Sequence, residues 1–216
     1  MRLHFLDARG ELTELRGWLR DRLVDAYTKA RELLPLLPID VVVKAGKFVI
    51  PEKGHVGYAP DPGKVFVTVD PDNPALMTNS NSSLERMLVH ELHHSARWDG
   101  PGYGSSLGEA LVSEGLAGHF VQEVYGGPAE PWESIEIEKV RAHIARAARD
   151  WGASDYDHKA WFYGTGELPK WVGYSLGFQL VANFLDMYSD QRASGLVHAD
   201  AQAFRGCLKE IQQVKS

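Results

Sequence analysis

Apolar residues recur at steps of three and four along residues 11–34, mainly as leucine and alanine. This spacing places them on one face of a helix, and Pro35 and Pro38 predict its end. The pattern then changes, because residues 39–70 contain three short β-branched runs. Lys64–Asp70 is the clearest strand, bounded on both sides by proline-containing turns. Since the connections are short, the sequence predicts a small antiparallel sheet here.

The rest of the chain favours helices. Residues 82–98 and 106–125 each begin with Ser-x-x-Glu, the form of a helix capping box. Helix, sheet and then helices is an α+β order, and no linker or internal repeat interrupts it. We therefore expect one domain over residues 1–216, with the helix and sheet in about 1–75 and a helical part in about 80–216. Further helices are predicted over residues 133–151, 171–188 and 199–214.

The first of the two capped helices carries His90-Glu91-Leu92-His93-His94, an H-E-x-x-H sequence. Positions i and i+4 share one helix face, so His90 and His94 are able to hold one metal ion. Glu91, one residue further round, reaches the water at that metal without being a ligand. His93 lies about 100° round the helix from His94, and we expect it to be a surface or hydrogen-bonding histidine.

A catalytic zinc site takes three protein ligands, and the second helix offers Glu109 and Glu114. They are separated by about 140° around the helix, so they do not face one metal together. Glu109 is already used by the predicted capping box, whereas Glu114 stands in an apolar stretch where an unpaired carboxylate is costly. Gly115 would let this helix approach the histidine helix closely. We therefore predict Glu114 as the third ligand.

These residues resemble the gluzincin metallopeptidases, the thermolysin-like clan. The H-E-x-x-H sequence of residues 90–94 is followed by Glu114 after 19 intervening residues. Residues 113–117, Ser-Glu-Gly-Leu-Ala, most resemble an uncharacterised bacterial group of predicted zinc-dependent proteases. Residues 168–177 resemble the C-terminal Pro-x-x-x-Gly-Tyr-x-x-Gly pattern of that group. The likeness covers roughly residues 64–188.

The resemblance implies a zincin-like fold, one Zn²⁺ ion and hydrolysis of peptide bonds, with an edge strand beside the active-site helix that pairs with substrate. By this analogy Lys64–Asp70 is the expected edge strand. The chain departs from thermolysin around the third ligand, where Ser113 replaces an Asn and Ala117-Gly118 replace a Ser-Asp pair. The sequence therefore does not identify the group that would orient a ligand histidine. The candidates are Asp99, Glu109 and a backbone carbonyl.

The expected reaction uses Glu91 as the general base for the attacking water. A hydrogen-bond donor is also needed for the developing oxyanion. Tyr174, between Gly173 and Gly177, is our candidate for this catalytic role, although a core or interface tyrosine is the alternative. Weaker candidates are Tyr163, His119 and His158.

The composition of the chain limits the kinds of partner and the location that we expect for the protein. A net charge of −6 argues against a nucleic-acid or anionic-membrane surface. The single cysteine, Cys207, allows no intramolecular disulfide and no cysteine-ligated zinc site. The N-terminus lacks the features of a signal peptide, and no apolar run approaches the ~20 residues that cross a bilayer. We expect a cytoplasmic enzyme acting on a peptide or protein, of open oligomeric state.

Two other function classes stay open. The first is a non-catalytic zincin fold that binds a partner, against which the intact Glu91 speaks, because a structural metal needs no base. The second is a di-iron carboxylate protein, in which Glu91-x-x-His94 pairs with the weak second motif of residues 155–158. That architecture needs four long helices with further inward glutamates. The β-rich run of residues 39–70 argues against it.

Overall fold

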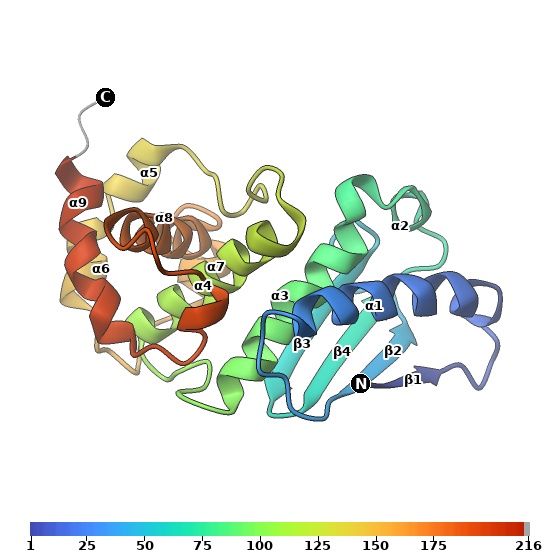
Figure 1. The fold of residues 1–216 in the computed structure, drawn as a ribbon. Helices are drawn as coiled ribbons and strands as arrows, with labels where there is room; N and C mark the ends of the chain where they lie inside the picture. The colour runs from blue at the N-terminus through green and yellow to red at the C-terminus, as the bar shows by residue number, and fades with distance from the viewer. Residues whose placement is uncertain (214–216) are drawn as a thin grey trace. The chain divides into compact units, whose positions relative to one another are not determined.

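The computed structural model describes residues 1–213. The chain forms two compact units, Met1–Asp99 and Gly100–Ser216. The first is a mixed sheet with helices and the second is almost entirely helical, so the α+β class is confirmed. Figure 1 shows the elements of each unit. The expectation of a single domain stays a prediction.

The sheet of the first unit is mixed, so the predicted antiparallel sheet is wrong. Its order is β1-β2-β4-β3, with β1/β2 and β2/β4 parallel and only β3/β4 antiparallel. A helix crosses over between β1 and β2, and β3 runs back along the outer side of β4, so that β1, β2 and β4 all point the same way. The short strand β1 at the N-terminus was not predicted from the sequence pattern. The strands are β1 (Arg2–Leu6), β2 (Asp40–Ala45), β3 (His55–Asp61) and β4 (Lys64–Val69).

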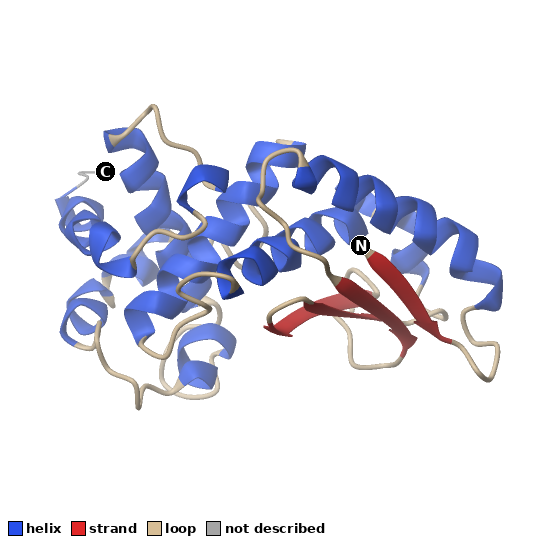
Figure 2. Cartoon of the chain, turned by 60° about the horizontal axis from the view of Figure 1, so that its bottom comes forward, coloured by secondary structure: helices blue, strands red, loops and turns tan. Residues whose placement is uncertain are grey.

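One face of this sheet is covered by α1 (Arg16–Arg31) and α3 (Ser83–Trp98) (Figure 2). Alternation puts every second residue of β2 and β4 on that face. Five of these residues are valines and are fully buried: Val41, Val43, Val65, Val67 and Val69. The predicted helix of residues 11–34 is thus observed as η1 (Thr13–Leu15) followed by α1. The shorter helices of this unit are α2 (Pro74–Thr78) and η2 (Ser80–Ser82).

Helix α3 begins where the sequence predicts, but the predicted capping box is wrong. Ser82 has a left-handed backbone, with φ 55°, and its side chain caps nothing. An N-cap residue normally has an extended backbone that aims its oxygen at the first turn. Asn79 replaces it, because its Oδ1 accepts from the backbone N–H of Leu84 at 2.9 Å and its Nδ2 donates to Glu85 at 2.7 Å.

The second unit is built on α4 (Leu107–Tyr125) and α8 (Val172–Met187), both close to their predicted bounds. The helix predicted over 133–151 is broken into α5 (Ile137–Arg141) and α6 (Ile144–Arg149). The last predicted helix is observed as η4 (Ala201–Cys207) and α9 (Leu208–Gln213), and residue 214 lies outside the described residues. The remaining helices are α7 (His158–Tyr163) and η3 (Ser194–Leu196).

Two glycines allow α4 and α8 to pack with their backbones almost touching. A Cβ atom on Gly115 would lie 2.2 Å from the carbonyl oxygen of Gly177, and one on Gly177 would lie 2.2 Å from that of Leu111. The neighbour that Gly115 accommodates is therefore α8, not the histidine helix that we expected. Since Gly115 follows Glu114, this contact also fixes the position of Glu114 within the unit.

None of the helices within residues 1–213 has the length and apolar character needed to cross a membrane.

Candidate metal centre

His90 and His94 lie one turn apart on α3, and their rings meet edge-on. Their Nε2 atoms are 3.0 Å apart, and the ring planes are inclined by 80°. His94 is buried and His90 is half-buried. The spacing predicted from the sequence therefore brings two ligand-type nitrogens to one point. His93, expected to be a surface or hydrogen-bonding histidine, is fully buried, so it is not a surface residue.

Glu91 lies on the side of α3 that packs against β3. Directly opposite is Gly57, where an added Cβ would come within 2.5 Å of the Glu91 Cγ atom. The contact between α3 and β3 is fixed on both sides of this point. His55 Nε2 and Ser83 Oγ are 2.7 Å apart, and Trp98 Nε1 donates to the carbonyl of Ala59 at 3.0 Å.

The outer strand next to α3 is β3, not the predicted Lys64–Asp70. That segment forms β4, which lies between β2 and β3 and has no open edge. The prediction failed because a sequence pattern shows that a segment is a strand but not which strands flank it.

The outer edge of β3 presents the main-chain groups of every second residue. The N–H of Asp70 donates to the carbonyl of Gly54 at 2.9 Å, which makes His55 and Val69 a non-hydrogen-bonded pair. By alternation, the main-chain groups of His55, Gly57 and Ala59 point away from β4. The carbonyl of His55 accepts from Ile50 N at 3.2 Å, and that of Ala59 accepts from Trp98. Gly57, opposite Glu91, directs its main-chain groups outward at this edge.

Glu114 is a buried carboxylate on α4, only 7% exposed. The hydroxyl of Tyr103 donates a hydrogen bond to its Oε1 at 2.8 Å. Burial, followed by the negative charge of Glu114, holds the pKa of Tyr103 well above its ordinary value. The hydroxyl therefore stays protonated, as a donor to Glu114. Sequence reasoning missed Tyr103, although its position between Gly102 and Gly104, both with positive φ, indicated a sharply turned loop.

Three more polar rings accompany Glu114 in this unit. Tyr156 Oη and His158 Nδ1 are 3.1 Å apart. Burial and the charge of Glu114 raise the pKa of Tyr156 to about 12. Burial lowers the pKa of His158, and Glu114 opposes that shift. Tyr174 contributes to the raised pKa of Tyr103, and its ring packs edge-on against that of Phe162. Two of the predicted oxyanion candidates, Tyr174 and His158, thus belong to the surroundings of Glu114.

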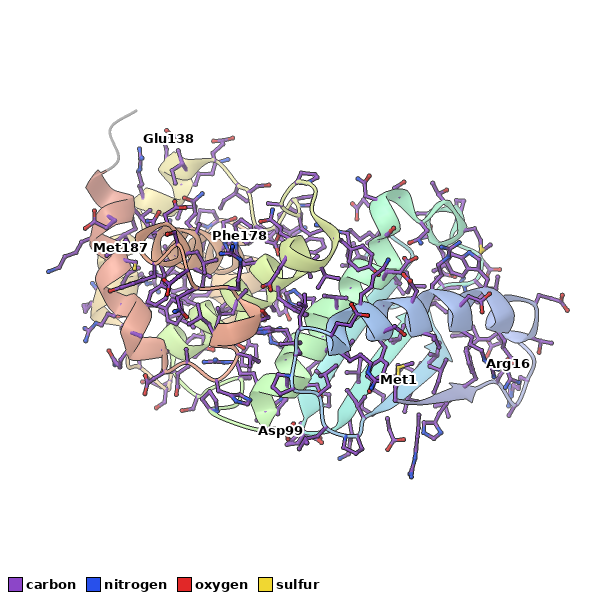
Figure 3. All side chains as sticks on the ribbon, viewed as in Figure 1. Met1, Arg16, Asp99, Glu138, Phe178 and Met187 are labelled. Carbon is purple, nitrogen blue, oxygen red and sulfur yellow. The ribbon has the colours of Figure 1, made fainter. Side chains whose placement is uncertain are left out.

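The other two candidates for the oxyanion donor, His119 and Tyr163, make different contacts. His119 stacks on Phe178, labelled in Figure 3, with ring centroids 4.0 Å apart. Its Nε2 lies 2.9 Å from the carbonyl oxygen of Phe178, and burial lowers the pKa of the ring. His119 is therefore a neutral donor that joins α4 to α8. Tyr163 is 51% exposed and meets His158 edge-on.

Glu109 is held by the N-terminus of α4, as predicted. Its Oε2 accepts from the backbone N–H of Ser106 at 2.9 Å and from that of Ser105 at 3.0 Å, and the Ser106 hydroxyl completes a capping box. A carboxylate used in this way is a poor choice as a metal ligand. Asp99, the other carboxylate considered for orienting a histidine, is the exposed C-cap of α3.

A family model described as predicted Zn-dependent protease (DUF2268) matches residues 19–205. The chain belongs to this family. It is also 33% identical over 154 residues to the uncharacterized protein YjfC of Bacillus subtilis (strain 168). That match takes in 63% of this chain and 50% of YjfC, so the chain spans about half the length of this curated relative. No solved structure matches the chain significantly.

Proposed function

We propose that this protein is a zinc-dependent peptidase, in which His90, His94 and Glu114 hold one Zn²⁺ ion and Glu91 is the general base. The observation that carries the proposal is the pair of facing imidazole nitrogens, 3.0 Å apart on consecutive turns of α3. Membership of a family described as predicted Zn-dependent proteases supports it.

The donor atoms suit zinc. Two Zn–N bonds of ~2.0–2.1 Å at a tetrahedral angle would place the nitrogens about 3.4 Å apart, close to the observed separation. Glu114 adds a carboxylate oxygen to the two nitrogens, which completes the two-histidine, one-glutamate set of catalytic zinc sites. Tyr103 donates a hydrogen bond to Oε1 and so would hold the Glu114 carboxylate in place for the metal. A hydrogen bond of this kind orients a ligand and strengthens its binding.

The chemistry divides among residues of this chain. Zinc, when bound, supplies Lewis-acid polarisation of the substrate carbonyl and favours deprotonation of water. Glu91 accepts a proton from the water as it attacks the carbonyl carbon, then delivers that proton to the leaving amine. Tyr174 donates a hydrogen bond to the carbonyl oxygen as that oxygen gains negative charge. His158 is the second candidate for this donor.

The substrate that we propose is an extended peptide. A peptide segment adds to an open sheet edge through its main chain, which makes the contact independent of side-chain sequence. On β3 the main-chain groups of Gly57 point away from β4, so pairing there would register one substrate residue above Glu91. The predicted role of an edge strand is thus transferred from β4 to β3.

Particular residues argue against the two alternative functions, a di-iron carboxylate protein and a non-catalytic binding module. Asp155 is exposed and precedes the short helix α7, so the second half of a di-iron motif is not presented by a helix. A binding module without catalysis needs neither Glu91 nor a buried Glu114 with a dedicated donor.

Metal analysis of the purified protein, combined with digestion of a peptide library, tests the proposal. We expect about one zinc per chain. Glu91→Gln should keep the metal and lose hydrolysis by a factor of about 10²–10⁴, the usual contribution of a general base. Full activity in Glu91→Gln would refute the mechanism, and a zinc-loaded wild-type protein that cuts no peptide would favour a binding module.

The third ligand is decided by a matched pair on α4. Glu114→Ala should lose zinc, whereas Glu109→Ala should retain it and only destabilise the helix start, typically by about 1 kcal/mol. Normal zinc content in Glu114→Ala would remove Glu114 from the site.

A further inference from the structure

Gly57 is a glycine for reasons of space. Its φ is not among the positive values of the chain, so its backbone conformation is open to any residue. An added Cβ, however, would lie 2.4 Å from Met87 Sδ, 2.5 Å from Glu91 Cγ and 3.0 Å from Glu91 Cδ. Favourable carbon contacts begin near 3.5 Å, so Glu91 would have to move by about 1 Å.

The backbone of helix α3 cannot readily move away from β3, because it is held on both sides of Gly57. On one side of Gly57 the buried ring of His55 meets Ser83, and on the other Trp98 is bound to Ala59. Ser83 and Trp98 are the first and last residues of α3, so the helix is held to β3 at both ends. The displacement is therefore directed into the two side chains in the middle, those of Met87 and Glu91.

We propose that Gly57 is a positioning residue for the Glu91 carboxylate. Its bare backbone leaves the space in which the Cγ and Cδ atoms of Glu91 lie, and this sets where the carboxylate ends. A side chain at this position turns the base away from the reacting water while leaving His90 and His94 in place, because the three atoms nearest to the added Cβ all belong to Met87 and Glu91.

This role rests on the proposed function of Glu91. A shift of about 1 Å in a catalytic group costs on the order of 100-fold in rate. We expect Gly57→Ala to lower kcat by about 10- to 100-fold, with little change in KM and with one zinc per chain retained.

The experiment compares Gly57→Ala, Met87→Ala and the double variant Gly57→Ala/Met87→Ala by steady-state kinetics, zinc content and crystal structure. Met87→Ala alone should behave as the wild type. The double variant removes the Met87 contact, so it should fold even if the single variant does not, and it should keep the loss in kcat. Crystals should show the Glu91 carboxylate displaced and the backbone of α3 unmoved.

A second background separates positioning from general damage. In Glu91→Gln, Gly57→Ala should cause no further loss of rate, since the group on which it acts is already disabled. An additive loss would overturn the proposal, as would a Glu91 carboxylate that stays in place or wild-type kcat in the double variant. Absence of hydrolysis by the zinc-loaded wild type would refute the peptidase function itself. An unmoved Glu91 in the variant crystals would refute only the role of Gly57.

Discussion

Replacing Gly115 by alanine tests how α4 is held in the second unit. The new Cβ would meet three atoms of α8: the Gly177 carbonyl oxygen at 2.2 Å, its carbon at 2.6 Å and Val181 Cγ2 at 2.8 Å. Two of the three belong to the backbone, so no change of rotamer relieves the contact. The helices would have to separate by about 1 Å, given ordinary contact distances near 3.5 Å.

The expected loss of stability follows from two opposing terms. Overpacking of a well-packed interior costs about 1–3 kcal/mol, and the upper value applies because the obstruction is backbone. Alanine returns about 1 kcal/mol through its higher helix propensity. The net change is then about 2 kcal/mol, which lowers Tm by about 4–8 °C in a chain of this size. Gly177→Ala should act alike, since its Cβ would meet the Leu111 carbonyl oxygen at 2.2 Å.

Thermal unfolding followed by circular dichroism measures this difference. Chelator should be present, because bound zinc would add its own stabilisation. The control is Gly17→Ala in α1, where nothing lies within 4 Å of the added Cβ. That substitution should leave Tm unchanged or raise it, because only the propensity term acts. Equal Tm values for Gly115→Ala and Gly17→Ala would refute the close packing of α4 on α8.

Two further predictions concern α4. Tyr103→Phe removes the donor to Glu114 but keeps the ring, and it should weaken zinc binding by about 10- to 100-fold in a chelator competition; the exposed Tyr163→Phe should bind zinc normally. Burial lowers the pKa of His119 below that of an unfolded histidine, so the unfolded chain binds more protons and stability falls as pH drops through about 6.5 towards the folded pKa. In urea titrations at pH 7 and pH 5, His119→Phe should lessen this fall; an unchanged pH dependence would show that another group causes it.

The elements that depend on local pattern were predictable. Periodic apolar residues predicted α1, because the residues that a helix buries recur at fixed spacing in its own sequence. The pair His90 and His94 was predictable for the same reason, since one helical turn joins them. The capping box of Ser106 and Glu109 also involves only neighbours, and its confirmation supports the choice of Glu114.

Features that depend on contacts between residues distant in sequence were decided by the tertiary structure. The segment Lys64–Asp70 is a strand by its own residues, but its interior place follows from which strands pair beside it. Ser82 has the right sequence for a cap, yet the chain arrives with a left-handed backbone and Asn79 takes the role. Contacts such as Tyr103 to Glu114, or Gly57 to Glu91, join segments whose approach no periodicity encodes, because that approach is set by how whole elements pack.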